Sequence, residues 1–206
     1  MLARENPFRT ETVLSYRYVF HDGQSLESLT KDFNRLNRRA AIVGPKGHGK
    51  TTLAEDLEHA WLDRGEDVVL LRLTTEDHAR DAIATVDAVL ESVSRSTTLI
   101  LDGAEQLGWF SWRRVLRRAS LLNGLLITVH KAGRLPTLRE CQTNPTLLAD
   151  IVQAVAPNES LTLLPRIEPL FDQHSGNIRQ CLRSLYDVCA ASGSASADRR
   201  PGPETL

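Results

Sequence analysis

Residues 40–52 constrain the fold of this chain more than any other stretch, and they read AAIVGPKGHGKTT. The stretch fits a pattern of glycine, four residues, and then glycine, lysine and a hydroxyl residue, at Gly44, Gly49, Lys50 and Thr51. Such glycines let successive backbone N–H groups surround phosphate oxygens, the lysine reaches the β- and γ-phosphates, and the threonine hydroxyl ligates Mg²⁺. A helix that starts at the lysine adds the positive end of its dipole. The pattern predicts a phosphate-binding loop if a strand precedes it and a helix follows it.

The flanking segments supply that context. Residues 40–43 form a short apolar run, as in a central parallel strand. Residues 51–64 repeat apolar side chains at helical spacing, and Gly65 ends the helix. An ordinary glycine-rich turn is the alternative, and it rarely has both neighbours. We therefore predict that the chain binds ATP with Mg²⁺. The predicted nucleotide-binding residues are Gly44, Pro45, Lys46, Gly47, His48, Gly49, Lys50, Thr51 and Thr52.

Composition limits the classes of partner. The chain has 206 residues, enough for one sizeable core and a small appendage. Its net charge of −1 gives no overall attraction to nucleic acid, so a nucleic-acid partner would need a local basic patch. No apolar run approaches the roughly 20 residues that span a bilayer, and the first residues lack the apolar core of a signal peptide. The three cysteines show no metal or redox spacing. These features predict a cytoplasmic protein without a membrane partner.

A second candidate site residue follows a later apolar run. Residues 97–102 read TTLILD and have high strand propensity, so Asp102 is expected at the carboxyl end of a parallel strand. The phosphate loop opens at that same edge of the sheet. A carboxylate there can hold Mg²⁺ directly or through water, whereas the alternative role is to cap a following helix. We predict that Thr51 and Asp102 are the metal-binding residues.

The remaining pattern predicts an α/β fold, a three-layer P-loop core with a parallel sheet followed by a small helical lid. Strands are expected at residues 67–73 and 125–129 besides those already named, with amphipathic helices between them, and residues 135–141 are a candidate for the last strand. The aromatic residues Tyr16, Tyr18 and Phe20 either enclose the base of the nucleotide or cover an edge of the sheet. The expected segments are an N-terminal arm at 1–24, the nucleotide-binding core at 25–142, the helical lid at 143–191 and a disordered tail at 192–206.

Residues 109–122 form a helix with two different faces. One face is apolar, and the other carries the arginines Arg113, Arg114, Arg117 and Arg118. Such a row can reach a neighbouring subunit's γ-phosphate or grip a phosphate backbone, although it is more often a solvated face. Further along, Thr128 and His130 lie near a strand end, where a polar side chain can sense the γ-phosphate or form a turn.

The order of these pieces over residues 6–190 resembles the AAA+ and STAND group of P-loop ATPases. It is most similar to the small ATP-binding modules related to replication initiators and transposition helpers. In that family the strand ending at Asp102 is the Walker B strand, and the strand at residues 125–129 is the sensor strand. The lid of the family carries a Gly-Asn-x-Arg type motif, which matches Gly176-Asn177-Ile178-Arg179 here. The resemblance implies that Arg179 reaches the γ-phosphate from the lid.

The sequence departs from the family at two places. The family places a glutamate directly after the Walker B aspartate to activate water, but here that position is Gly103 and the next carboxylate is Glu105. The link between Val129 and Thr137 is also short for the helix that carries the family's trans-acting arginine. ATP binding is therefore better supported than hydrolysis.

We predict an ATP-binding, Mg-dependent, AAA-like module whose hydrolysis is slow or stimulated by a partner and is coupled to lid movement. Its predicted catalytic residues are Lys50, Glu105 and Arg179. Two alternatives stay open: a P-loop kinase for a small molecule, and an adaptor that keeps its nucleotide without hydrolysing it. Besides the nucleotide, the sequence allows a protein partner or a second copy of the chain, and its net charge does not support nucleic acid.

Overall fold

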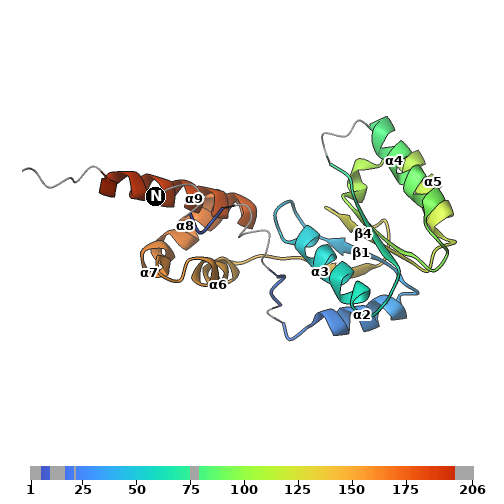
Figure 1. The fold of residues 1–206 in the computed structure, drawn as a ribbon, viewed down its shortest axis with the longest axis horizontal. Helices are drawn as coiled ribbons and strands as arrows, with labels where there is room; N and C mark the ends of the chain where they lie inside the picture. Colours follow the sequence, from blue (N-terminus) through green and yellow to red (C-terminus); the bar gives the residue numbers. More distant parts are fainter. Residues whose placement is uncertain (1–5, 10–16, 21, 75–78, 198–206) are drawn as a thin grey trace, which may run out of the picture. The chain divides into compact units, whose positions relative to one another are not determined.

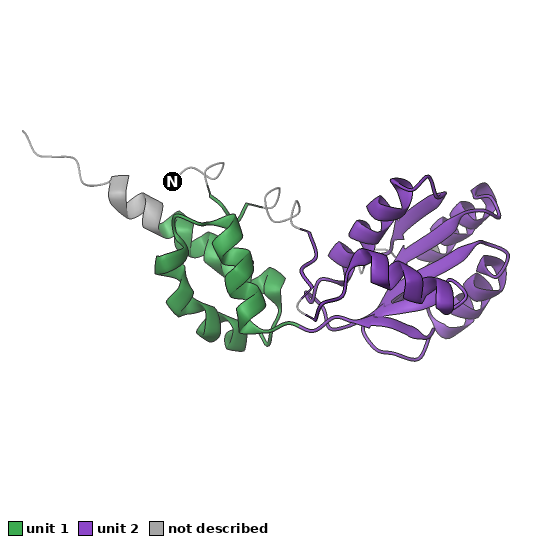
Figure 2. Ribbon diagram, turned by 90° about the horizontal axis from the view of Figure 1, so that it is seen from below, with its two compact units in different colours: residues 1–16, 143–206 green, residues 17–142 purple. Residues whose placement is uncertain are grey.

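The structure is a computed structural model, and it describes residues 6–9, 17–20, 22–74 and 79–197. The chain divides into two compact units, which Figure 2 distinguishes by colour. The α/β unit comprises residues 17–142, and the helical unit combines residues 1–16 with residues 143–206. The division after residue 142 coincides with the end of the predicted core.

The predicted N-terminal arm does not stay together as one segment. The amide of Asn6 donates a hydrogen bond to the carbonyl of Tyr186, 2.9 Å away, and Phe8 is buried in the core of the helical unit. In contrast, the backbone N–H of Tyr18 donates to the Asp56 carboxylate of the α/β unit, at 2.6 Å. The described residues of the arm thus serve two units, and the rest of it, including Tyr16, lies outside the described residues.

The α/β unit is built on a five-stranded sheet in the order β2-β3-β4-β1-β5. The strands are β1 Arg39–Val43, β2 Val68–Arg72, β3 Thr98–Asp102, β4 Gly124–Val129 and β5 Thr137–Glu140. All neighbouring strands pair in parallel. The predicted parallel sheet is confirmed, and β4 lies between the strand before the phosphate loop and the strand that ends at Asp102.

Helices cover both faces of this sheet, as the predicted three-layer core requires (Figure 1). They are α2 Leu26–Arg35, α3 Lys50–Leu62, α4 Ala79–Ser92, the short 3₁₀-helix η2 Ala104–Gln106, and α5 Trp109–Ala119. Helices α2 and α3 pack on one face, and α4 and α5 pack on the other. β1 shows why, because its side chains alternate: Ala40 and Ile42 join the first layer, and Ala41 and Val43 join the second.

The helical unit contains α6 Pro145–Val155, α7 Ser160–Leu163, η3 Leu164–Arg166, α8 Ile167–Gln173 and α9 Ile178–Ala197. The side chain of Asn144 caps α6 by accepting a hydrogen bond from the N–H of Leu147 at 2.7 Å, and Pro145 occupies the first turn, where no donor is lost. The predicted tail boundary at residue 192 is wrong, because α9 continues to Ala197. Residues 192–197 read SGSASA, in which the two alanines favour helix and Gly193 does not. Residues 198–206 lie outside the described residues.

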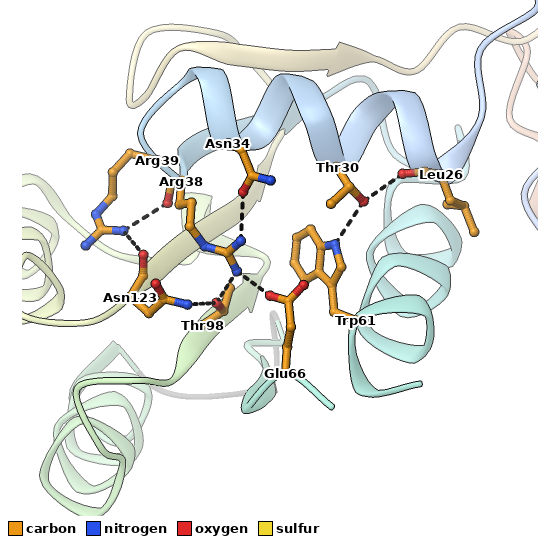
Figure 3. A network of polar contacts seen from close by, with 9 residues as sticks. All are labelled: Leu26, Thr30, Asn34, Arg38, Arg39, Trp61, Glu66, Thr98 and Asn123. Carbon is orange, nitrogen blue, oxygen red and sulfur yellow. Dashed lines mark hydrogen bonds and ion pairs between the residues drawn. The ribbon is translucent and has the colours of Figure 1, made fainter. Parts of the chain in front are cut away.

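Arg38 fixes the entry into β1 from the amino-terminal side of the sheet (Figure 3). The chain turns there through Asn37 and Arg38, both in the left-handed region with φ of 53° and 55°. The Arg38 guanidinium donates to Asn34 Oδ1 at 2.8 Å, to Glu66 Oε2 at 2.6 Å and to Thr98 Oγ1 at 2.8 Å. These contacts join the end of α2 to the segments that precede β2 and begin β3, which offsets the cost of two left-handed residues.

Trp61 completes this junction between α2 and α3. Its ring is fully buried and stacks on Phe33 with ring centroids 5.0 Å apart, and the Arg38 guanidinium lies over the same two rings. The indole N–H donates to Thr30 Oγ1 at 3.0 Å, so the polar edge of the ring is satisfied (Figure 3). The helix that carries the phosphate loop is therefore anchored at its far end.

Replacing Arg38 with methionine should lower the free energy of unfolding by about 2 to 3 kcal/mol, because it leaves the partly buried Glu66 carboxylate without its cation. Urea titration followed by tryptophan fluorescence measures this effect in the α/β unit alone, since all three tryptophans lie within residues 17–142. Arg35→Met is the control, because Arg35 forms an exposed pair with Asp32 and its loss should cost at most about 0.5 kcal/mol. Equal shifts for the two variants would refute the role of Arg38.

Candidate nucleotide-binding site

The phosphate loop leaves β1 at Gly44 and is backed by the strand on its other side. A Cβ at Gly44 would lie 2.7 Å from the backbone carbonyl oxygen of Cys141, closer than real Cβ atoms come. The N–H of Gly44 donates to the carbonyl of Val129 in β4, at 3.2 Å. The loop therefore begins wedged between β4 and the residue after β5, which is why this position takes glycine.

Lys50 begins α3 and lies inside the loop. Gly49 is the N-cap of this helix in the left-handed conformation, and neither a side-chain cap nor an acidic residue occupies the first turn. Lys50 is only 7% exposed, and its Nζ donates to the Pro45 carbonyl at 2.9 Å. The loop thus encloses a buried cation at a helix N-terminus whose N–H groups lack side-chain caps, an arrangement that suits phosphate.

Asp102 connects the loop to the centre of the sheet. Its carboxylate is 9% exposed and accepts a hydrogen bond from the Thr51 hydroxyl at 2.9 Å and another from the Thr128 hydroxyl at 2.5 Å. Thr128 Oγ1 in turn accepts from the N–H of Gly103 at 2.8 Å. The two predicted metal ligands, Thr51 and Asp102, are therefore adjacent, and Thr128 holds the aspartate in place.

The position after Asp102 is closed to any side chain. Gly103 has φ of 86°, and a Cβ there would lie 2.4 Å from the carbonyl oxygen of Leu73, which follows β2. The N–H of Leu73 also donates to the Asp102 carbonyl at 2.8 Å, so the segments that follow β2 and end β3 are held together at this point. The family's glutamate at this position would collide with the backbone, which explains the first departure from the family pattern.

Glu105 lies two residues further, in η2. Its Oε1 is 3.0 Å from His130 Nε2, at the residue that follows β4. Its Oε2 is buried, and within the described part of the chain it has no hydrogen-bond partner. The carboxylate that follows Gly103 in sequence is therefore held through one oxygen, and its other oxygen is buried without a partner among the described residues.

Arg134 braces the backbone around Glu105. Its guanidinium donates to the Ala104 carbonyl at 2.7 Å and to the Leu107 carbonyl at 2.6 Å, and it lies 5.2 Å from the centre of the Trp112 ring. Burial lowers the pKa of Arg134 from its usual value, and the nearby Glu105 opposes that shift. Arg134 is not predictable from the sequence, because a single arginine in a loop carries no spacing signal.

The described part of the N-terminal arm lies against the same loop. Tyr18 approaches Gly49, and its hydroxyl is 3.7 Å from the Cys141 sulfur. Burial raises the pKa of Tyr18 to about 12 and also raises the pKa of the Cys141 thiol. The pKa of His48, in the loop itself, is lowered, mainly by burial. These pKa shifts all favour the neutral forms of the three groups, whereas Lys50 is the buried cation of the loop.

The predicted site residues thus divide into two groups. Lys50, Thr51 and Asp102 lie together at the carboxyl edge of the sheet, and Glu105 follows on η2. Arg179 is exposed in the first turn of α9, in the helical unit, where the side chain of Asn177 accepts a hydrogen bond from the N–H of Gln180 at 3.1 Å. The Gly-Asn-Ile-Arg motif therefore has a local role as a helix start, and a contact of Arg179 with nucleotide stays a prediction.

Thr128 and the arginine row show what the sequence did not reveal. The Thr128 hydroxyl faces Asp102, whereas the sequence suggested that it senses the γ-phosphate or forms a turn. In the arginine row, Arg114 and Arg118 pair with Asp87 of α4 at 2.8 and 3.1 Å. Half of that row is thus a structural link between two helices.

Comparison with solved structures identifies the fold. Thermotoga maritima RuvB, described as a Holliday junction branch migration motor, matches with a TM-score of 0.56 and 18% identity, over 84% of this chain and 63% of that chain. The K64R mutant of Thermotoga maritima RuvB matches with a TM-score of 0.55 and 17% identity, over 85% of this chain and 65% of that chain. No protein-family model and no curated protein sequence matches this chain.

These matches and the site define the class of fold. The chain has the fold of the AAA+ P-loop ATPases, which confirms the resemblance at the level of fold. Identities of 17 and 18% carry no further conclusion about activity, and the chain covers less than two thirds of the length of RuvB. Among the residues that the structure describes, no helix has the length and apolar character needed to cross a bilayer.

Substituting Gly103 by alanine should lower the free energy of unfolding by at least about 2 kcal/mol, because the left-handed backbone and the Leu73 carbonyl both oppose a Cβ. Thermal or urea unfolding followed by tryptophan fluorescence measures the change. Gly108→Ala is the matched control, since Gly108 has φ of −61° and nothing within 4 Å of an added Cβ. If the Gly103 variant were as stable as the Gly108 variant, the conclusion that the position after Asp102 has no room for a side chain would be wrong.

Proposed function

We propose that this protein binds ATP with Mg²⁺ at the phosphate loop and hydrolyses it slowly or on stimulation by a partner. The observation that carries the proposal is the contact between Thr51 and Asp102 beside the buried Lys50. A threonine at a helix start and a carboxylate at a strand end are separated by 51 positions in sequence, yet their oxygens lie 2.9 Å apart. The alternative role for Asp102 is to cap a following helix, and that role would not need a buried lysine nearby.

The oxygen donors of this pair suit Mg²⁺. Magnesium is usually held by one or two carboxylates together with phosphate oxygens and water, not by a full cage of protein ligands. The described residues contain no cluster of three His, Cys, Asp or Glu, so a site of the caged kind has no support in that part of the chain. Thr51 and Asp102 would hold the ion, and when bound it neutralises charge on the phosphates.

The residues of the chain divide the work as follows. The loop N–H groups and Lys50 bind the phosphates, and Thr128 keeps the Asp102 carboxylate oriented. Glu105 is assigned as the general base that accepts a proton from the attacking water, with its Oε1 held 3.0 Å from His130 Nε2. Arg179, from the helical unit, contacts the γ-phosphate and so relates nucleotide state to the position of that unit.

Removal of the Lys50 charge should weaken ATP binding by about 10- to 100-fold, since a charge-assisted contact contributes about 1.5 to 3 kcal/mol. Isothermal titration with Mg-ATP compares wild type with Lys50→Ala. Lys31→Ala is the control, because Lys31 is an exposed lysine on α2 that pairs with Glu27. Wild-type protein without measurable ATP affinity would overturn the proposal, and so would equal affinity of the two lysine variants.

Hydrolysis is tested separately at Glu105. Glu105→Gln should reduce ATP turnover at least about 100-fold, as expected for loss of a general base, and leave ATP affinity within about threefold. Phosphate release under single-turnover conditions measures the first quantity and titration the second. Glu91→Gln, an exposed carboxylate on α4, is the control. Arg179→Ala in the same assays should also lower turnover more than affinity.

Two outcomes of that experiment would contradict the assignments. Equal turnover in wild type and Glu105→Gln would remove Glu105 from the mechanism. ATP that stays intact for hours in wild-type protein would instead support the adaptor that retains its nucleotide, a function that the closed Gly103 position also permits. In that case the proposal that the protein binds ATP is kept, and the proposal that it hydrolyses ATP is rejected.

A further inference from the structure

Helix α5 begins with two aromatic side chains that lie in solvent. Trp109 is 61% exposed and Phe110 is 83% exposed, and their rings meet edge to face with centroids 5.1 Å apart. Large apolar side chains exposed as a pair are unusual on a monomer and mark binding surfaces more often than isolated ones do. The two rings are thus held in a defined arrangement without being used in the core.

Arginine side chains extend this aromatic pair along the helix. The Arg113 guanidinium lies 4.8 Å from the centre of the Trp109 ring. Arg117 follows one turn later on the same face, and both arginines are exposed. Neither makes an ion pair within the described residues, whereas Arg114 and Arg118 pair with α4. We call Trp109, Phe110, Arg113 and Arg117 the aromatic–arginine platform.

The charge of the platform selects the chemistry of its partner. Helix α5 reads WFSWRRVLRRA and contains no acidic residue, and the two acids facing it from α4, Asp87 and Glu91, are already paired. An exposed guanidinium and a ring face together complement a ligand that offers an anion next to a flat apolar surface. Nucleotides in a strand offer both at every step, since a phosphate follows each base.

We propose that the aromatic–arginine platform binds single-stranded nucleic acid, with bases stacked on Trp109 and Phe110 and phosphates held by Arg113 and Arg117. A double-stranded partner is disfavoured, because its bases are already stacked and only the arginines would engage. The proposal does not depend on ATP binding, and the overall charge of −1 does not oppose it, because the positive charge is local.

The intrinsic fluorescence of the protein gives a direct test. Trp61 and Trp112 are buried, so Trp109 is the tryptophan that a stacked base would quench. Full-length protein without nucleotide is titrated with a fluorescein-labelled 20-nucleotide oligothymidine at low salt, following anisotropy, and with unlabelled strand, following quenching. We expect saturable binding at micromolar protein that weakens steeply with salt, together with quenching.

Variants separate stacking from charge. Phe110→Ala should weaken binding about tenfold, within the range measured for loss of one stacked base. Trp109→Phe retains a ring, so it should keep the affinity within about threefold while losing the quenching. Leu121→Ala is the matched control, an exposed apolar side chain just beyond the other end of α5, and it should bind as wild type does. An abasic strand of equal length, which keeps the phosphates, should bind at least about tenfold more weakly.

Three results would overturn the proposal. The first is no binding of the oligothymidine at low salt. The second is binding that Phe110→Ala and Leu121→Ala affect equally, or an abasic strand that binds as tightly as the intact one, because then charge alone would explain the interaction. The third is absence of binding together with self-association, seen by sedimentation, that Phe110→Ala abolishes. The platform would then be a contact between copies of the chain.

Discussion

The pair of hydrogen bonds accepted by Asp102 is the interaction on which the site depends. Its two carboxylate oxygens accept from Thr51 in α3 and from Thr128 in β4, so one side chain joins three segments distant in sequence. A carboxylate that is almost buried costs free energy unless it is hydrogen-bonded, and here both oxygens are. These hydrogen bonds fix the start of the helix that follows the phosphate loop relative to the central strands β3 and β4.

The backbone beside Asp102 then decides where a catalytic carboxylate can be. Leu73 approaches so closely that Gly103 cannot carry a side chain, and the chain turns at once into η2. This turn brings Glu105 to His130, and the guanidinium of Arg134 holds the carbonyls on either side of it. The missing glutamate at position 103 is therefore a steric consequence of how β2 meets β3. It does not by itself show that a base is lacking.

The sequence predicted those parts of the site that local pattern encodes. The loop, Lys50, Thr51 and the strand-final Asp102 follow from spacing and apolar runs, and the parallel sheet follows from their order. The roles of Thr128 and Cys141 depend on the order of the strands in the sheet. Thr128 lies on β4, between β3 and β1, and Cys141 follows β5 and backs the phosphate loop. Local sequence pattern does not determine strand order. The predicted tail boundary at residue 192 rests on small and polar residues, but these do not exclude helix, and α9 continues to Ala197.

The candidate nucleotide site and the aromatic–arginine platform are joined by the short segment that follows β3. Between Asp102 and Trp109 the chain makes only a turn and η2, and Arg134 fixes the carbonyls of Ala104 and Leu107 within it. Trp112, on the buried face of α5, packs under the guanidinium of Arg134, so helix and turn are braced by one side chain. The start of α5 is therefore tied to the strand that ends at Asp102 by a short segment whose carbonyls are hydrogen-bonded to one guanidinium.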